Sequence, residues 1–289
     1  MSSLVAPQDT PGPMARTVDD AARILDVVVG FDEQDPDTAF NAIRPLAASS
    51  TSFQDAIRNP GLRNKRLGVL REVFGSHAGV TSALTTALEN FEQAGAQLVE
   101  VSIPDLGRFK SSTSMYVPRA KSDIDAFLAS RPDLSQLTVE DLHASGGCNE
   151  YLDLIDAIIQ GPADPTTDAG LGKCFMEQAE FRRLVASIFA KHQLDAIVYP
   201  TCQLPAPKTR DVLERRWACL TYPTNTVIAS QLLFPAISVP IAMVEDSEDG
   251  SSGPRLPVGL ELLGLPFDEE RLMAAAAGVE AVQHENIAW

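Results

Sequence analysis

The sequence predicts an α/β protein of 289 residues. Segments with the apolar pattern of strands are separated by segments with helical periodicity, and this alternation is typical of the α/β class. The clearest case is the stretch 66–103, which predicts a strand, a helix and a second strand in succession. Three further strand-like segments follow within 195–264, and no internal repeat is visible.

The first predicted helix begins at Thr17 and ends at Gly30. Thr17 and Asp20 form a weaker version of the Ser/Thr-x-x-Glu capping box, and one face of the helix carries Ala21, Ile24, Leu25 and Val28. The stretch 32–63 is polar, contains prolines and is rich in Ser and Thr near its middle. It therefore predicts a long connection rather than a packed element.

The next unit resembles a βαβ motif. Its first strand is "RLGVL" at 66–70, its helix runs over 80–94 to Gly95, and its second strand covers 97–103. We expect the two strands to be parallel neighbours, because a helix of this length connects them.

The stretch 110–192 is predicted to be mainly helical. It contains a capping signal at Thr138 and Asp141, a helix that stops at Gly161 and a long helix over 173–192. Strand patterns and a closing helix then follow at 195–201, 236–244, 256–264 and 268–283.

Charge and hydropathy exclude two classes of partner. The chain has 39 Asp plus Glu against 23 Lys plus Arg, a formal net charge of -16, and no basic cluster to offset it. Nucleic acid is therefore not expected as a partner. No apolar run approaches the roughly 20 residues that cross a bilayer, and the first residues lack a signal-peptide pattern. We expect no membrane partner and a cytoplasmic location.

No metal or cofactor motif is present. The four cysteines form no CxxC pair, the four histidines show no metal-binding spacing, and the glycines form no phosphate-binding loop. We expect reduced structural cysteines, no metal and no cofactor.

The "GSSG" run at 250–253 resembles a serine-nucleophile loop. It lies in an acidic, Pro-terminated stretch between two predicted strands, where flexible polar residues suit a hairpin loop. No Lys or His lies near Ser251 or Ser252 in the sequence to act as a base, so we interpret the run as a loop.

Five ordered motifs carry the strongest information. They are "DTPGPMARTVDDAARILDVVVG", "KRLGVL", "LDAIVYPTCQLPAP", "PTNTVIASQLLFPAISVPIAM" and "LPVGLELLGLPFDEERLMAAAAGVE". In order and spacing they closely resemble the second part of amidase signature family enzymes, from about Leu4 to Gln283.

The resemblance implies a fold. Family members share one large α/β/α domain with a mixed β-sheet between helical layers. We therefore expect 1–289 to form a single truncated domain of this type, with a largely helical insertion at about 110–192.

The resemblance also implies a chemistry. Family members hydrolyse amides with a serine nucleophile, a second serine in a cis peptide and a lysine base, supplied upstream of the Pro-Gly-Pro block. In this sequence no Lys precedes Lys65, and no Gly-Gly-Ser-Ser-Gly-Gly run occurs. We expect the chain to begin where the catalytic half of such an enzyme would have ended, and not to hydrolyse amides alone.

By resemblance, six residues are candidates for substrate-pocket walls: Asp9, Thr10, Gly12, Thr201, Cys202 and Asn225. Structural roles stay open for each. Asp9 and Thr10 suit a cap of the Pro-containing turn, Gly12 suits unusual backbone geometry, and Asn225 suits the N-cap of a helix over 226–233. Thr201 suits the end of a strand and Cys202 suits packing.

Three functions stay open at this point. The first is a remnant, subunit or truncated gene product of an amide hydrolase, with a small amide as ligand. The second is a repurposed biosynthetic isomerase, cyclase or lyase, and the third is a scaffold that binds a full-length relative. A homo-oligomer or an amidase-family partner is expected in each case, because a sheet without its remaining strands exposes an edge.

Overall fold

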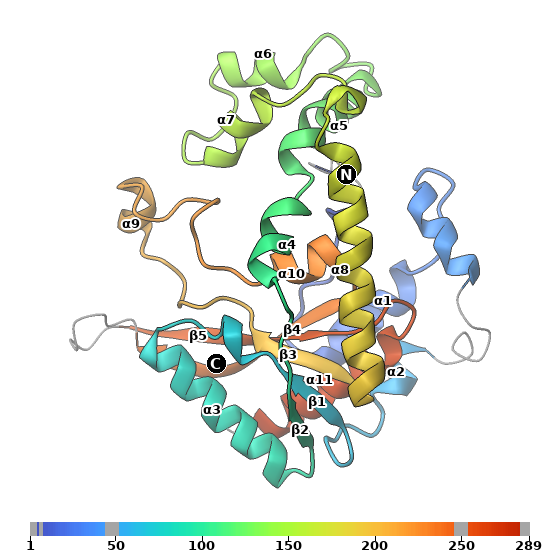
Figure 1. Ribbon diagram of the computed structural model, residues 1–289, viewed down its shortest axis with the longest axis vertical. Helices are drawn as coiled ribbons and strands as arrows, with labels where there is room; N and C mark the ends of the chain where they lie inside the picture. The colour runs from blue at the N-terminus through green and yellow to red at the C-terminus, as the bar shows by residue number, and fades with distance from the viewer. Residues whose placement is uncertain (1–4, 6–7, 44–51, 246–253, 284–289) are drawn as a thin grey trace.

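The computed structural model describes residues 5, 8–43, 52–245 and 254–283. Its centre is a five-stranded sheet in the order β2-β1-β3-β5-β4 (Figure 1). The strands are β1 Arg66–Val69, β2 Gln97–Glu100, β3 Ala196–Pro200, β4 Ala236–Glu245 and β5 Arg255–Leu263. β1 is parallel to both β2 and β3, whereas β5 is antiparallel to β3 and β4. The predicted mixed sheet and the parallel β1–β2 pair are therefore confirmed.

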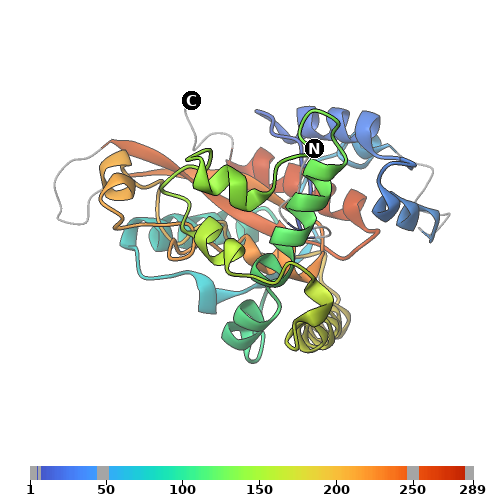
Figure 2. The ribbon, with the colours of Figure 1, turned by 90° about the horizontal axis from the view of Figure 1, so that it is seen from above.

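Helices cover both faces of the sheet (Figure 2). One face packs against α1 Val18–Val28, α2 Phe53–Ala56, α3 Ala78–Gln93 and α11 Glu269–Gln283. The other packs against α4 Leu106–Ser112, α8 Leu171–His192 and α10 Val227–Leu232. Each face of the sheet thus has its own hydrophobic core, because side chains along a strand alternate between the two faces. On β3, Ala196 and Val198 belong to the core on the first face, whereas Ile197 and Tyr199 belong to the core on the second.

The first helix forms as the sequence predicts. Its N-cap is Thr17, whose hydroxyl accepts a hydrogen bond from the Asp20 backbone N–H at 3.0 Å. α1 begins at the next residue and ends at Val28, just before Gly30. The capping pattern therefore fixes the beginning of the helix.

The expectation of an unpacked connection over 32–63 is wrong for its second half. Phe53, Ile57 and Leu62 are buried in the core, and the stretch also contains the 3₁₀ helix η1 Pro36–Ile43 and the helix α2. The backbone N–H of Phe53 donates to the Asp26 carboxylate on α1 at 2.6 Å. Phe53 and Ile57 have the i, i+4 spacing of one helix face, but two apolar positions in a polar stretch are too short a pattern to predict burial, so only the tertiary structure reveals it.

The predicted helical stretch contains α5 Tyr116–Ala129, α6 Val139–Ala144 and α7 Asp153–Ile159, besides α4 and α8. These three helices share a small hydrophobic core with Val5 and with Cys174 of α8, and they project from the sheet (Figure 1). At the start of α6, Thr138 and Asp141 form the full capping box.

The remaining elements match the predicted order. The helix α9 Thr209–Leu213 lies in the long segment between β3 and α10, and β4 and β5 form an antiparallel pair with a bulge between Pro240 and Ala242. The "GSSG" run at 250–253 lies outside the described residues. Among the described helices, none is long and apolar enough to cross a membrane.

Candidate functional site

An open hollow of about 370 Å³ lies where the N-terminal segment meets α5 and α10. It is lined by Gln8, Asp9, Thr10, Tyr116, Thr226, Val227 and Ser230. The N-terminal segment, the first residue of α5 and the first turns of α10 thus converge from distant parts of the chain. Two of the six sequence candidates, Asp9 and Thr10, line this hollow.

A carboxylate–phenol pair lies in the hollow. The hydroxyl of Tyr116 donates to Oδ1 of Asp9 at 2.8 Å, and Oδ2 accepts from the Val5 backbone N–H at 3.1 Å. Burial and the neighbouring Asp9 raise the pKa of Tyr116 to about 12. The phenol therefore keeps its proton near neutral pH and acts as a neutral donor to the carboxylate.

Gln8 anchors the N-terminal segment beneath the hollow. Its buried side chain donates to the Thr113 carbonyl and accepts from the Met115 backbone N–H, both at 2.9 Å. Its own carbonyl accepts a hydrogen bond from Ser230 Oγ at 3.1 Å. The segment is thus held between the α4–α5 junction and α10. Sequence reasoning missed Gln8, Tyr116 and Ser230, because no local pattern links them.

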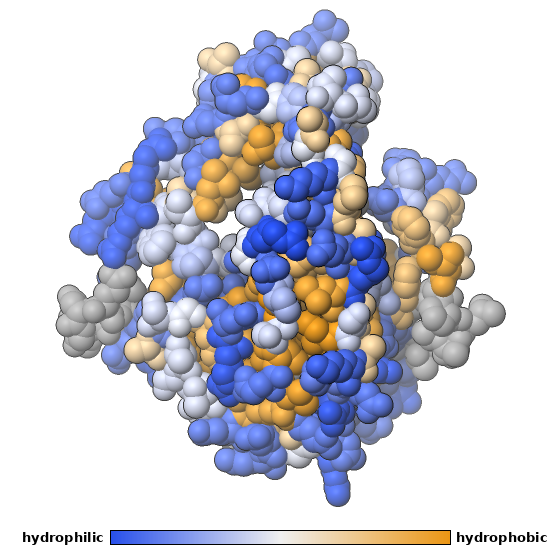
Figure 3. All heavy atoms as spheres, viewed as in Figure 1, coloured by the Kyte–Doolittle hydropathy of each residue, from blue (hydrophilic) through white to orange (hydrophobic). Residues whose placement is uncertain are grey.

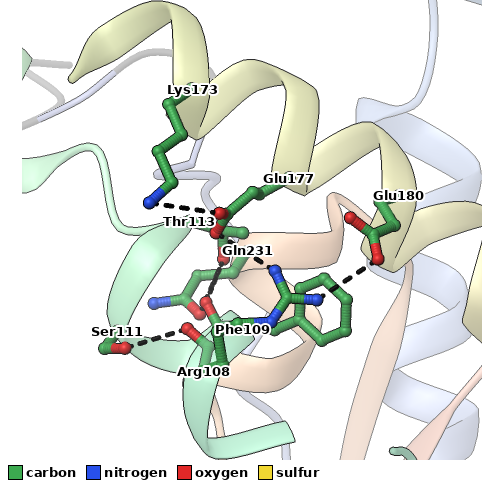
Figure 4. A network of polar contacts seen from close by, with 8 residues as sticks. All are labelled: Arg108, Phe109, Ser111, Thr113, Lys173, Glu177, Glu180 and Gln231. Atoms are coloured by element: carbon green, nitrogen blue, oxygen red, sulfur yellow. Dashed lines mark hydrogen bonds and ion pairs between the residues drawn. The ribbon is translucent and has the colours of Figure 1, made fainter. Parts of the chain in front are cut away.

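A polar network links α10 to α4 (Figure 4). Gln231 on α10 donates to the Lys110 carbonyl on α4 at 2.9 Å and accepts from the Thr113 hydroxyl at 3.1 Å. In the same network, Arg108 on α4 lies 3.5 Å from Glu177 and 3.2 Å from Glu180, both on α8. The network therefore ties α4, α8 and α10 together.

A second cluster lies at the end of β3. Asn225 is fully buried, and its amide donates to the carbonyls of Val73 at 2.9 Å and Pro200 at 2.8 Å. Its oxygen accepts from the Gln203 side chain at 3.2 Å. The helix N-cap that sequence reasoning left open for Asn225 is not formed, because the N-cap of α10 is Thr226 and has no side-chain cap. Asn225 instead ties three chain segments together.

Cys202 lies beside Thr224 in the same cluster. The two residues form an isolated antiparallel bridge, and their side chains are 3.7 Å apart between Sγ and Oγ1. Burial raises the pKa of the Cys202 thiol, so the thiolate is not favoured. This environment therefore disfavours nucleophilic reactivity of the Cys202 thiol.

Thr201 ends a hydrogen-bonded row across the sheet. Its hydroxyl lies 2.9 Å from the Ser238 hydroxyl on β4, and Ser238 pairs in register with Glu261 on β5. Oε1 of Glu261 accepts from the Tyr199 hydroxyl on β3 at 2.9 Å. Burial raises the pKa of Glu261 to about 7. Sequence reasoning missed Glu261, although a lone acid inside the apolar run "LPVGLELLG" is a signal for a special environment.

The structure places the six sequence candidates in different surroundings. Asp9 and Thr10 line the hollow, whereas Thr201, Cys202 and Asn225 belong to the cluster at the end of β3. Gly12 is exposed, lacks a positive φ, and would have open space around a Cβ. In the part of the chain that the structure describes, no group of three His, Cys, Asp or Glu side chains could hold a metal ion.

Comparisons with known proteins place these features in a family. The Amidase family model matches residues 3–273. The chain is 29% identical over 280 residues to a glutamyl-tRNA(Gln) amidotransferase subunit from Myxococcus xanthus (strain DK1622), a match that covers 94% of this chain and 54% of the relative.

Solved structures agree on the fold. The crystal structure of PAM12A superposes with a TM-score of 0.77 at 25% identity, over 99% of this chain and 56% of that one. Native peptide amidase from Stenotrophomonas maltophilia superposes with a TM-score of 0.74 at 24% identity. The match covers 98% of this chain and 55% of that one. The chain thus spans about half the length of the relatives that it matches. Because the family model matches almost the whole sequence and the mixed sheet between helical layers recurs in these structures, the chain belongs to the amidase signature family.

Proposed function

We propose that this chain provides the substrate-side part of an amide hydrolase and does not hydrolyse amides by itself. Family membership supports amide chemistry, and the similar proteins include a peptide amidase and a glutamyl-tRNA(Gln) amidotransferase. The observation that carries the proposal is the hollow at Asp9, Tyr116 and Ser230. It can receive a small molecule, but its lining residues include no activated nucleophile.

Three of the described lysines lie in ion pairs. Lys65 lies 3.5 Å from Asp195, Lys121 2.6 Å from Glu140 and Lys173 3.6 Å from Glu177, so these ammonium groups face carboxylates rather than a serine. Amide hydrolysis also needs preorganised hydrogen-bond donors for the oxyanion. Loss of one such donor lowers the turnover rate by a factor of roughly 10² to 10³.

A partner segment of the amidase family would complete the site in this proposal. Among the described strands, β4 lies at the end of the sheet, and its Ala236 and Ser238 are exposed. Apolar side chains are also exposed around the end of α1 and on η1, with Val27 at 84% and Phe31 at 66% (Figure 3). Open strand edges and exposed apolar side chains favour association, either with such a segment or with a second copy.

The four cysteines favour a reducing compartment. All four are free thiols in the structure, and Cys174 is buried. Free cysteines persist in the cytosol, where disulfides are rare. We therefore propose a cytoplasmic location.

The test is an amide hydrolysis assay on the purified chain, with its intact mass measured on the same sample. We expect no ammonia release above the uncatalysed rate from glutamine, benzamide and leucinamide. We expect ammonia release when the Gly/Ser-rich half of an amidase-signature enzyme is added in trans. Turnover by the lone chain at a confirmed mass of 31.1 kDa would contradict the proposal.

A further inference from the structure

We infer that copies of this chain associate head to tail, with the acidic face of one copy against the basic face of the next. The acidic face is the stretch 24–43, from the middle of α1 to the end of η1, and the basic face is the stretch 208–220, which contains α9 and the turn after it. The inference goes beyond the proposed function, because it needs neither a substrate nor turnover.

The acidic face combines exposed apolar side chains with charge of a single sign. Its stretch of the sequence contains five Asp or Glu residues and no Lys, Arg or His. The acids are Asp26, Asp32, Glu33, Asp35 and Asp37, and the exposed apolar side chains are Ile24, Val27, Val28, Val29, Phe31, Phe40 and Ile43. An apolar surface surrounded by carboxylates suits a partner that presents apolar and cationic groups together (Figure 3).

The apolar side chains of η1 do not belong to the hydrophobic core. No residue of η1 is buried, and Phe40 and Ile43 are 60% and 67% exposed. Local polar contacts hold the segment instead: the Thr38 hydroxyl donates to the Asp35 carbonyl at 2.6 Å, and the Asn41 side chain donates to the Gly30 carbonyl at 3.3 Å. Contact with another molecule would therefore remove apolar surface from water without disturbing the core.

The basic face offers the complementary chemistry. Leu213 and Leu220 are 52% and 59% exposed. Four cations accompany them and outnumber the two acids of the stretch, of which one is buried and one exposed. The cations are Lys208, Arg210, Arg215 and Arg216, and the acids are Asp211 and Glu214. The basic face thus presents the apolar and cationic groups that the acidic face lacks as a pair.

Contacts with the helices that project from the sheet hold the basic face in place. Arg215 donates to the Glu150 carbonyl at 2.9 Å, and its guanidinium lies over the ring of Tyr151. The backbone N–H of Leu220 donates to the Asp153 carboxylate at 3.2 Å. Because these contacts exist in the single copy, a partner does not have to order the face on binding.

The two faces lie on opposite sides of the molecule. Figures 1 and 2 both show α9 at the left and η1 at the right. One chain therefore cannot pair its own faces, and two copies cannot close both contacts at once. A contact between two acidic faces would bring like charges together. The favoured contact is heterologous and leaves a free face at each end for a further copy.

The experiment is sedimentation equilibrium of the purified chain at about 5, 50 and 500 µM in about 150 mM salt, where repulsion between distant charges is screened. The faces are small, with 13 residues in 208–220, so association is expected to be weak. We expect the weight-average mass to rise from 31.1 kDa with concentration and to pass twice that value. A constant mass, or a mass that stops at that of a dimer, would overturn the inference.

Two variants each block one face. Phe31→Ser with Phe40→Ser blocks the acidic face, and Leu213→Ser with Leu220→Ser blocks the basic face. We expect each variant alone to stay monomeric, and their equimolar mixture to form a dimer with one copy of each and nothing larger. Association of either variant alone, or no dimer in the mixture, would overturn the inference. Thermal unfolding checks that both variants fold, and the concentration series on the unmodified chain decides the question if one does not.

Charge reversals separate the two faces from the net charge. Glu33→Lys and Arg210→Glu should each weaken the association by roughly tenfold. The first change makes the chain less negative, which by itself would favour association. Glu89→Lys and Lys191→Glu make the same changes of charge at exposed positions on α3 and α8 and should leave the association as in the parent. Equal effects in the control variants would overturn the inference.

The Gly/Ser-rich half of an amidase-signature enzyme is the other candidate occupant of the acidic face. We expect its addition to leave the head-to-tail association intact. If it converts the assembly into a one-to-one complex, the acidic face belongs to that half and the inference is overturned. Hydrolysis of amides by the lone chain would contradict only the proposed function.

Discussion

The hydroxyl of Tyr116, the first residue of α5, donates a 2.8 Å hydrogen bond to Oδ1 of Asp9, 107 positions earlier in the chain. This bond joins the N-terminal segment to the helices that project from the sheet. It also fixes the position of Asp9, which carries the one formal charge among the described residues that line the hollow.

Replacement of Tyr116 by phenylalanine is expected to lower the free energy of unfolding by about 1 kcal/mol, because the Asp9 carboxylate loses its phenol donor. Urea denaturation measures the change. Tyr151→Phe is the matched control: its ring lies against Arg215, and no hydrogen bond of its hydroxyl is seen among the described residues. The control should stay within about 0.5 kcal/mol of the parent, and an equal loss in both variants would refute a specific role for the Tyr116 hydroxyl.

Glu261 predicts a pH dependence of stability. Burial raises its pKa to about 7, above the ordinary value of 4.5, so between these values the folded state holds a proton that the unfolded state releases. Its contribution to stability is therefore complete below about pH 4.5 and is lost as the pH rises through 7. Above pH 7 both states are ionised and the loss is complete.

The measurement is urea denaturation at pH 5 and pH 8 of the parent and of Glu261→Gln, whose amide oxygen can still accept from Tyr199. From pH 5 to pH 8, we expect the free energy of unfolding of the parent to fall by roughly 2 to 3 kcal/mol more than that of the variant. Glu89→Gln, at an exposed position, should follow the parent. The same pH dependence in all three proteins would show that Glu261 is not the titrating group.

Asn225 predicts a structural cost at the end of β3. Asn225→Ala leaves the carbonyls of Val73 and Pro200 without their buried donor, and we expect a loss of about 3 kcal/mol in the free energy of unfolding. Asn41→Ala is the control, because Asn41 is exposed and its side chain donates a 3.3 Å bond to the Gly30 carbonyl. If Asn225→Ala lowers the free energy of unfolding by less than about 1 kcal/mol, Asn225 does not hold these chain segments together.

Gly278 tests the packing of the segment that follows α2. A Cβ at this position of α11 would lie 2.9 Å from the Gly61 backbone and 2.8 Å from the Leu62 side chain. Gly278→Ala should therefore lower the free energy of unfolding by roughly 1 to 3 kcal/mol. Gly107→Ala is the control, since a Cβ there meets open space on a helix and should be neutral or slightly stabilising. Thermal denaturation of both variants checks the prediction, and a Gly278→Ala protein as stable as the parent would show that the two segments do not pack closely.

The sequence by itself determined the order and type of most elements. Thr17 with Asp20 and Thr138 with Asp141 indicated two helix starts, and the stretch 66–103 indicated the parallel βαβ unit. These signals act over a few residues, where capping geometry and the periods of helix and strand apply directly. The ordered motifs determined the family in the same way, because motif order and spacing are properties of the chain.

Only the tertiary structure decided the site. Tyr116 reaches Asp9 and Ser230 reaches Gln8 because α5, α10 and the N-terminal segment meet in space, and no local period encodes that meeting. Burial of Phe53, Ile57 and Leu62 and the raised pKa of Glu261 have the same origin, since both depend on which side chains surround a residue after the sheet and its helices have packed. Local backbone preference fixed the elements, and contacts between residues distant in the chain fixed the chemistry.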